Sequence, residues 1–235
     1  FRGGAGNDVG GGDEGQDLLF GNAGNDTLKG FRGNDRLWGN AGDDMLQGDV
    51  PGNDVGGNDR IFGGDGNDTI VGGEGRDRIH GGNGNDQSDG GNGRDLMSGG
   101  TGDDTQRGGP GNDRIFANLC VDTTYGEGGD DDLWALARGD VTPGEDTVAD
   151  TLVGGEGNDT FHLRDGEADK VDCGPGDKDD ARLDFVDVIV DATPANPKGS
   201  CEKVLRMAPK PKDKVENAKS EDKTQAPAED KKEKE

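Results

Sequence analysis

The sequence is short of the residues that build an ordinary hydrophobic core. Of its 235 residues, 27% are hydrophobic and only 4% are aromatic. A chain of this length with so few apolar side chains cannot offset the conformational entropy of folding by burial alone. We therefore expect the chain to be disordered unless a ligand stabilises its folded state.

Long apolar runs, serine and histidine are also scarce. No run approaches the roughly 18 apolar residues of a membrane-spanning helix, and no secretory signal peptide is visible after Phe1. The two histidines, His80 and His162, both fall at the outward last position of a nine-residue unit, where we expect surface residues. The few serines form no nucleophile motif, and H-E-x-x-H is absent. The sequence therefore predicts that these residues are not an enzyme.

Negatively charged residues outnumber positively charged ones. Lysine and arginine total 26 against 51 aspartate and glutamate residues, which gives a net charge of −25. Such an acidic chain is repelled by nucleic-acid phosphates and by anionic lipid surfaces. We therefore expect no nucleic-acid partner and no membrane insertion.

Glycine and aspartate are abundant, and they recur with a period of nine residues. Gly63–Val71 reads G-G-D-G-N-D-T-I-V, and Gly72–His80 follows in register as G-G-E-G-R-D-R-I-H. The shared pattern is G-G-x-G-x-D-x-U-x, where U is apolar. Three glycines in four positions indicate positive φ and close packing, which excludes a helix, and the β-prone residues after the aspartate predict a short strand. Each nonad is therefore one turn and one strand, and two nonads make a coil of 18 residues.

The aspartate that closes each turn is the candidate metal ligand. Stacked coils place Asp59 over Asp77 at the strand separation of about 4.8 Å, while Asp68 lies on the opposite edge. Carboxylates this close repel one another unless a cation lies between them. Hard oxygen ligands without cysteine or histidine select calcium. The candidate calcium ligands are Asp8, Asp17, Asp26, Asp35, Asp44, Asp59, Asp68, Asp77, Asp86, Asp95, Asp104, Asp113 and Asp159.

This repeat resembles the RTX family, the hemolysin-type calcium-binding nonapeptide repeat. Members of that family fold as a parallel β-roll with calcium in the turns. The resemblance implies an all-β fold: a parallel β-roll (RTX solenoid) with two nonads per coil, a C-terminal β cap and a disordered tail. Calcium ions are then the cofactor and the expected partner. The closing pattern from Val171 onward also resembles secreted actinobacterial members.

Departures from the repeat divide the chain into five segments. We expect Asn118 to Val141 to be irregular, with one imperfect copy of the repeat at Gly126–Trp134. We also expect Asp169 to lie one residue out of frame and an apolar-alternating strand to run from Leu183 to Val190. The segments are a first repeat block with an irregular junction (1–56), the main repeat block (57–117), an irregular insert with degenerate repeats (118–172), the cap (173–205) and the charged disordered tail (206–235).

The first repeat block departs from the pattern in two places. Phe31 stands where the second glycine is expected, and a left-handed backbone is costly for this residue, so calcium should bind less well near that turn. Asp59 follows Asp44 by 15 positions instead of nine, which we interpret as a loop that resets the frame.

The inward U positions differ between the two expected sheets. One sheet receives Ile61, Ile79, Met97 and Ile115, whereas the other receives Ile70, Ser88 and Gln106. Because buried polar groups need partners, we expect the second sheet to be softer near Ser88 and Gln106.

Three cysteines allow one disulfide. Cys173 and Cys201 both fall in the cap, and we expect them to pair, with a stabilisation of roughly 3 to 4 kcal/mol in the chain-entropy model. The alternative is free buried thiols in a cytosolic chain. Cys120 is then left over, either buried or paired with an upstream or partner chain.

Three other interpretations of the acidic turns explain less. A solvated acidic face accounts for the composition but not for the fixed period of nine. A phosphate-binding loop needs a following Lys-Ser/Thr and a helix, and acidic surroundings repel phosphate. An EF-hand over Asp177 to Asp184 lacks the required glycine, since its sixth position is Arg182.

Two classes of function fit these residues. The first is a secreted, non-enzymatic calcium-binding module, extracellular or at a cell surface, with a structural or adhesive role and a partner that the residues do not name. The second is the RTX calcium-binding portion of a larger secreted enzyme, a protease or lipase, with its catalytic domain upstream of Phe1. The cap and the charged tail favour the first, because many exported RTX toxins and enzymes end in an apolar-rich secretion signal.

Overall fold

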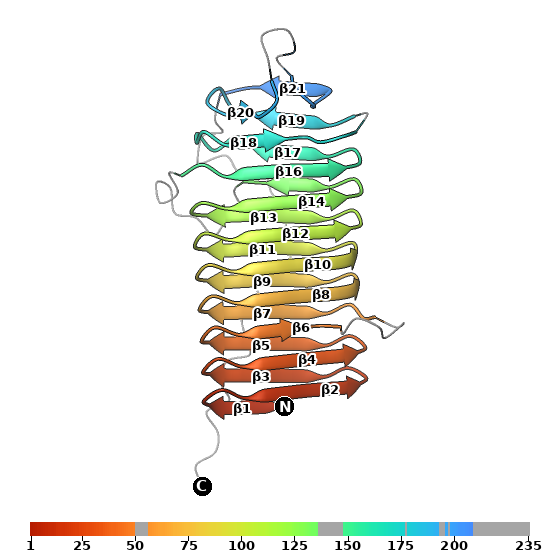
Figure 1. Ribbon diagram of the computed structural model, residues 1–235, viewed down its shortest axis with the longest axis vertical. Helices are drawn as coiled ribbons and strands as arrows, with labels where there is room; N and C mark the ends of the chain where they lie inside the picture. Colours follow the sequence, from red (N-terminus) through yellow and green to blue (C-terminus); the bar gives the residue numbers. More distant parts are fainter. Residues whose placement is uncertain (50–55, 136–147, 177, 193–195, 197, 209–235) are drawn as a thin grey trace.

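The fold is a stack of flattened coils. A computed structural model describes residues 1–49, 56–135, 148–176, 178–192, 196 and 198–208. The secondary-structure elements of these residues are 21 β-strands, and successive strands alternate between two sheets. Figure 1 shows the strands stacked in chain order from the N-terminal to the C-terminal end of the roll.

The odd-numbered strands form one parallel sheet and the even-numbered strands form the other. The 11-stranded sheet contains β1 (Arg2–Ala5), β3 (Leu18–Ala23), β5 (Arg36–Ala41), β7 (Arg60–Asp65), β9 (Arg78–Asn83), β11 (Leu96–Thr101), β13 (Arg114–Leu119), β15 (Asp132–Trp134), β17 (Thr160–Leu163), β19 (Asp180–Leu183) and β21 (Lys203–Arg206). The 10-stranded sheet contains β2 (Val9–Glu14), β4 (Thr27–Arg32), β6 (Met45–Gln47), β8 (Thr69–Gly75), β10 (Gln87–Gly93), β12 (Thr105–Pro110), β14 (Thr123–Gly128), β16 (Thr151–Glu156), β18 (Lys170–Asp172) and β20 (Val188–Ile189).

The register between strands follows the repeat. Ile61 pairs with Ile79, and Met97 pairs with Ile115, so paired residues are 18 positions apart in the main repeat block. All the strand pairs are parallel, and the prediction of a parallel β-roll with two nonads per coil is confirmed.

The U positions face inward and form the core. Side chains such as Leu37, Ile61 and Ile70 are fully buried between the two sheets.

The polar U residues Ser88 and Gln106 lie in the 10-stranded sheet, as the sequence predicts. Gln106 is 1% exposed, and its Oε1 accepts a hydrogen bond from Thr124 Oγ1 at 3.3 Å, but its Nε2 has no hydrogen-bond partner among the described residues. The lower stability of this sheet remains a prediction.

The expectation that Asn118 to Val141 are irregular is wrong for the part that the structure describes. β14 and β15 pair with β12 and β13, so both sheets continue through residue 134. Asn118 and Glu127 take positive φ, 87° and 75°, at turn positions where the repeat has glycine. The turn therefore survives the loss of glycine because other residues adopt the same backbone conformation. Residues 136–141 lie outside the described residues.

The predicted strand from Leu183 to Val190 is also wrong, because the segment crosses from one sheet to the other. β19 ends at Leu183, and β20 begins at Val188 in the opposite sheet. Between them the backbone N–H of Asp184 donates to Asp187 Oδ2 at 2.7 Å, and the N–H of Val186 donates to Asp184 Oδ1 at 2.9 Å. Two local aspartates thus make a turn where hydrophobic alternation alone predicted a strand.

The C-terminal cap consists of the last strands of both sheets. β20 and β21 end the two strand orders. Arg206 belongs to β21 and not to the tail, and its guanidinium donates to the carbonyl oxygens of Asp184 and Asp187 at 3.0 Å. The remainder of the predicted tail, residues 209–235, lies outside the described residues.

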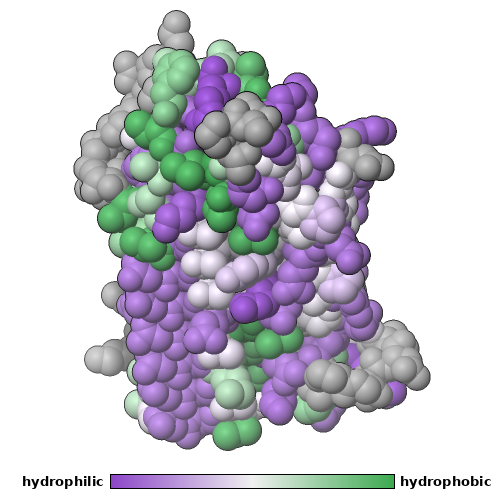
Figure 2. Space-filling model, turned by 45° about the horizontal axis from the view of Figure 1, so that its top comes forward, coloured by the Kyte–Doolittle hydropathy of each residue, from purple (hydrophilic) through white to green (hydrophobic). Residues whose placement is uncertain are grey.

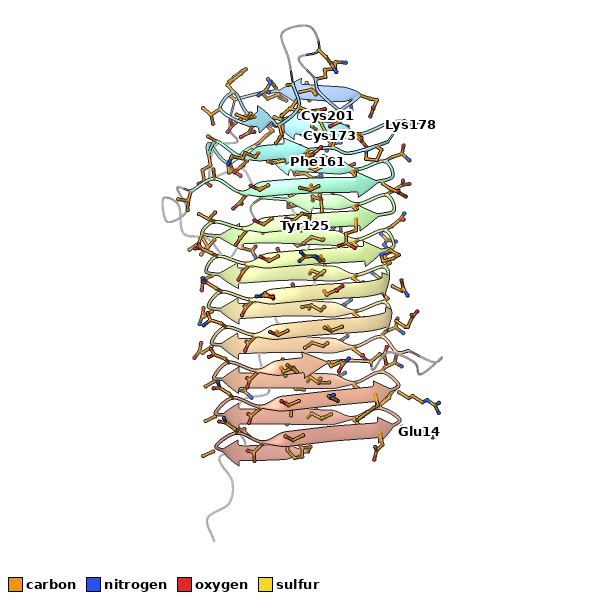
Figure 3. All side chains as sticks on the ribbon, in the orientation of Figure 1. Glu14, Tyr125, Phe161, Cys173, Lys178 and Cys201 are labelled. Carbon is orange, nitrogen blue, oxygen red and sulfur yellow. A yellow bond between two sulfur atoms is a disulfide. The ribbon has the colours of Figure 1, made fainter. Side chains whose placement is uncertain are left out.

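The predicted disulfide is present in this cap. Cys173 and Cys201 are bonded, with their Cα atoms 5.3 Å apart, and both are buried (Figure 3). The bond ties the end of β18 to the residues just before β21. Cys120 is partly exposed in the turn that follows β13.

The surface is hydrophilic along the roll and more hydrophobic at its C-terminal end, as Figure 2 shows. Phe185, Val186, Val188 and Val190 are each at least half exposed at that end. No helix in the described part of the chain is long and apolar enough to cross a membrane.

Candidate calcium sites in the turns

The turn aspartates form two columns, one along each edge of the roll. In each column the backbone N–H of one aspartate donates to Oδ1 of the aspartate in the next coil, at 2.7 Å for Asp59 to Asp77 and at 2.7 Å for Asp68 to Asp86. One column contains Asp8, Asp26, Asp44, Asp68, Asp86, Asp104, Asp122, Asp150, Asp169 and Asp187. The other contains Asp17, Asp35, Asp59, Asp77, Asp95, Asp113, Asp131, Asp159 and Asp179.

All thirteen predicted aspartates therefore lie in these columns, and from Asp8 to Asp113 successive ones lie on opposite edges. Those of the main block are at most 2% exposed, whereas Asp8 and Asp17 in the first coil are partly exposed. The stacking of aspartates two nonads apart is confirmed. Their binding of calcium remains a prediction.

The second carboxylate oxygen of each main-block aspartate is buried and has no hydrogen-bond partner among the described residues. This holds for Oδ2 of Asp59, Asp68, Asp77, Asp86, Asp95, Asp104 and Asp113. A buried polar atom without a partner costs roughly 1 to 3 kcal/mol, and more when it is charged. A column of such oxygens is therefore a strong indication of a bound cation.

The first glycine of each turn has no side chain, and this leaves room for Oδ2 of the turn aspartate. A Cβ added at Gly72 would lie 2.5 Å from Asp77 Oδ2 and 2.5 Å from the carbonyl oxygen of Gly90 in the next coil. A carboxylate oxygen and a main-chain carbonyl oxygen thus meet beside a residue that has no side chain. Any larger residue at this position would occupy the place where the two oxygens converge.

The second glycine of each turn has a left-handed backbone, and its replacements in the first block adopt it too. Gly64 and Gly73 have φ of 126° and 119°, and Asn40 and Phe31 have φ of 80° and 76°. Phe31 therefore takes the conformation that was expected to be costly for it. Weaker calcium binding near this turn remains a prediction.

Burial raises the pKa of the main-block column aspartates, and it is the largest cause in each case. The pKa of Asp77 rises to about 9, opposed by the hydrogen bond from the Asp59 N–H and increased further by the charges of Asp59 and Asp95. The pKa of Asp86 and of Asp104 rises to about 7. Without a cation, these carboxyl groups hold protons at pH values where an exposed aspartate is ionised.

The donor set fits calcium. Calcium takes six to eight oxygen ligands in flexible geometry, and the turns offer carboxylate and main-chain carbonyl oxygens. Within the described residues no group of three or more His, Cys, Asp or Glu side chains converges on a common point. The ligands other than the column carboxylates must therefore include carbonyl oxygens of the turns. When bound, calcium supplies the positive charge that balances the carboxylates of adjacent coils.

Sequence reasoning missed several column members because their turns depart from the glycine pattern or from the nine-residue spacing. Asp131 lies in the imperfect copy Gly126–Trp134, and Asp169 joins its column although it lies 19 residues after Asp150. The missed aspartates are Asp122, Asp131, Asp150, Asp169, Asp179 and Asp187. In most of these the aspartate is followed, two residues later, by an inward apolar residue, as in Asp169-Lys170-Val171, and a search for that triplet would have found them.

His80 is exposed, as expected, but His162 is not a simple surface residue. Its ring stacks on Trp134 with centroids 3.7 Å apart, and its Nε2 lies 2.8 Å from Asp132 Oδ1. Asp132 also accepts from the Arg114 guanidinium at 2.8 Å. His162 thus ties neighbouring coils together on the outer face of the 11-stranded sheet.

These turns and their columns of aspartate define a parallel β-solenoid of the calcium-binding repeat class. A family model described as RTX calcium-binding nonapeptide repeat (4 copies) matches residues 11–46, 54–88, 62–97, 89–119, 98–133 and 146–167. The chain belongs to this RTX repeat family. A search of curated proteins found no match.

Proposed function

We propose that this protein is a secreted, non-enzymatic calcium-binding module whose β-roll folds when calcium enters the turns. Its role outside the cell is structural or adhesive. The calcium-bound roll is a stiff rod with a hydrophilic side surface, and the same chain without calcium is expanded.

The observation that carries this proposal is the column of buried carboxylate oxygens without partners. Asp59, Asp77 and Asp95 lie in consecutive coils of one edge, each at most 2% exposed and each with Oδ2 unsatisfied. Burying like charges in a row is unfavourable unless a cation accompanies them. The core of the main block also includes two polar U residues, Ser88 and Gln106, so it buries less apolar surface than an entirely apolar core would.

Two features support a place outside the cell. The Cys173–Cys201 disulfide is of a kind that forms and persists in oxidising compartments. Extracellular calcium modules typically have Kd values of about 10⁻⁴ to 10⁻³ M, so weak sites of this kind fill in the extracellular medium and stay empty in the cytosol. Titration of free thiols in protein recovered from culture medium tests this part, and reduced Cys173 and Cys201 would contradict it.

Small-angle scattering tests the folding proposal. An expanded chain of 235 residues has a radius of gyration of roughly 50 Å, more than twice that of a compact state of the same length. We expect the radius to fall by about half when calcium is added to metal-free protein and to rise again with chelator. A compact metal-free protein at neutral pH would contradict the proposal.

A further inference from the structure

The outer face of the 11-stranded sheet is basic from β1 to β13, although the chain as a whole has a net charge of −25. Each strand from β3 to β13 turns two side chains outward, one on either side of its inward U residue, and β1 adds Arg2. None of these outward residues is acidic. We call this surface the basic face, and its arginines are Arg2, Arg36, Arg60, Arg78 and Arg114.

Three of the arginines lie directly beside one another. Arg36 pairs in register with Arg60, and Arg60 pairs with Arg78, on adjacent parallel strands. Like charges opposite each other on neighbouring strands are unfavourable. Arg114, at the border of the face, bonds to Asp132 of β15 at 2.8 Å. The row from Arg36 to Arg78 therefore favours a segment with negative charge alongside it.

A ladder of aromatic rings runs next to this row. Trp38 stacks on Phe20 with centroids 4.8 Å apart and on Phe62 with centroids 5.6 Å apart. The guanidinium of Arg2 lies 5.0 Å from the centroid of the Phe20 ring. The faces of the inner rings are thus occupied by other rings, so a nucleic-acid base or a sugar ring cannot stack on them. The ladder offers ring edges, which are electropositive and suit carbonyl or carboxylate oxygens.

Trp38 is buried more deeply than its two ring neighbours explain. It is 5% exposed, and its Nε1 is buried without a hydrogen-bond partner among the described residues. Trp134 occupies the same slot of the repeat and also has a ring on each side, Phe116 and His162, yet it is partly exposed. The burial of Trp38 therefore calls for a cover over the ladder, and its N–H calls for an oxygen acceptor.

The sequence after Ala208 contains a segment that fits this face. Residues 221–230 consist of two acidic pairs, Glu221-Asp222 and Glu229-Asp230, on either side of a stretch that ends in the uncharged residues Gln-Ala-Pro-Ala (225–228). In the extended conformation that proline favours, ten residues span about 31 Å. The basic face covers six strand spacings, from β1 to β13, or about 29 Å. The segment and the face therefore match in charge and in length.

The segment can also reach the face. The described chain ends just after β21, which belongs to the same sheet and lies four strand spacings, or about 19 Å, beyond β13. Residues 209–220 extend up to about 40 Å.

We propose that residues 221–230 of this chain bind along the basic face. The acidic pairs lie at the arginines, residues 225–228 cross the aromatic ladder, and a carbonyl oxygen of the segment accepts the Trp38 N–H. A segment of this composition has too few apolar residues to fold alone, so it becomes ordered only on the surface that binds it. This inference goes beyond calcium-dependent folding, because it assigns an intramolecular partner to the side of the roll.

The test follows hydrogen exchange of the Trp38 indole N–H by NMR in the full chain at saturating calcium. Trp134→Phe is present in every sample, so that one of the two tryptophans remains. The tail variant carries Glu221→Gln, Asp222→Asn, Glu229→Gln and Asp230→Asn. The matched control removes four acidic charges elsewhere in the same tail, with Asp213→Asn, Glu216→Gln, Glu233→Gln and Glu235→Gln. We expect exchange to become about tenfold faster in the tail variant and to stay unchanged in the control.

Three results would overturn the inference: unchanged exchange in the tail variant, equal acceleration in both variants, or protection that falls on dilution, which would mean that a second copy covers the face. If the tail variant lacks the β signal of the roll, a spin label on Ala228→Cys in a Cys120→Ser background decides. Broadening of the Trp38 N–H signal supports the inference, and its absence overturns it. These measurements need a folded roll but do not depend on whether calcium drives folding, so either proposal can fail without the other.

Discussion

At the scale of single residues, Asp8 and Asp86 occupy the same slot of the repeat but have different surroundings. Asp86 is 2% exposed, accepts the N–H of Asp68 through Oδ1 and donates its own N–H to Asp104. Asp8 lies in the coil of β1 and β2, at one end of the described stack, and is partly exposed. In the proposed arrangement an interior aspartate would contact ions above and below it, whereas Asp8 would contact fewer.

We predict that Asp86→Ala destabilises the calcium-loaded roll more than Asp8→Ala does. Each weak site contributes roughly 0.5 to 2 kcal/mol at millimolar calcium, so loss of a ligand shared by two sites should cost about 1 to 4 kcal/mol. Thermal melting at fixed calcium measures both variants. Equal effects, or a larger effect at Asp8, would contradict the assignment of shared ions.

Some of the turn aspartates could be predicted from the sequence and others could not. Aspartates in turns with two or three glycines, such as Asp68 and Asp77, were placed correctly because glycine and aspartate repeat together. Asp122 was missed because residues 117–121 contain no glycine, and Asp169 because it lies one residue out of frame, although the fold still places both in the columns. Asp49, which follows β6 and is 5% exposed, could not be predicted as buried, because its burial depends on its packing against the backbone of Gly57 and Glu74.

At the scale of elements, the 10-stranded sheet contains the weak part of the core. Ser88 in β10, Gln106 in β12 and Thr124 in β14 follow one another at inward positions. Gln106 Nε2 is buried without a hydrogen-bond partner in the described part of the chain. Burial of an unsatisfied amide group costs roughly 1 to 3 kcal/mol.

We predict that Gln106→Leu stabilises the calcium-loaded roll by about 1 to 2 kcal/mol, because it replaces a buried unsatisfied amide with an apolar side chain. The melting temperature should rise. Gln87→Leu on the exposed face of β10 is the control and should change stability by no more than about 0.5 kcal/mol. A lower melting temperature for Gln106→Leu would mean that the amide has a partner that the fold requires.

The cap is stabilised by the Cys173–Cys201 disulfide. We predict that Cys201→Ser lowers the melting temperature of the calcium-loaded protein, with a loss of roughly 3 to 4 kcal/mol for a loop of this length. Hydrogen exchange should become faster from β18 to β21 and remain slow in β7 to β13, since the cap covers the last strand edges. Cys120→Ser should leave the cap unchanged. Uniform loss of protection along the roll would contradict a local role for the bond.

Strands outside the regular repeat were harder to predict, because local side-chain hydrogen bonds there override the pattern of alternating hydrophobic residues. The residues from Leu183 to Val190 alternate as a strand does, yet Asp184 and Asp187 bond to nearby backbone N–H groups and make a turn. Such side-chain bonds leave no signal in a hydrophobic pattern.

At the scale of the whole molecule, the buried carboxyl groups should make the roll respond to protons as well as to calcium. Burial raises the pKa of the main-block aspartates above their ordinary value of about 4, to about 6 for Asp68 and about 9 for Asp77. A raised folded pKa means that the metal-free folded state binds protons more tightly than the unfolded chain does. Its contribution to stability is therefore present below about pH 4 and is lost as the pH rises through about 6 to 9.

We predict that metal-free protein gains β structure as the pH is lowered from 8 to 4, because protons neutralise the columns in place of calcium. Calcium affinity should fall over the same range, since ions and protons compete for the same oxygens. Far-ultraviolet circular dichroism of metal-stripped protein in calcium-free buffer measures the first effect. A metal-free chain with the same signal at pH 4 and pH 8 would contradict the assigned burial of these carboxyl groups.

The most direct measurement is a calcium titration of residues 1–208 at neutral pH, followed by circular dichroism. The account predicts a β signal that is absent in excess chelator and appears cooperatively near millimolar calcium, because each interior turn shares ions with the coils above and below it. Magnesium should not substitute, since it requires a tighter octahedral site than these turns provide. A β signal complete in excess chelator, or produced equally well by magnesium, would contradict calcium-dependent folding.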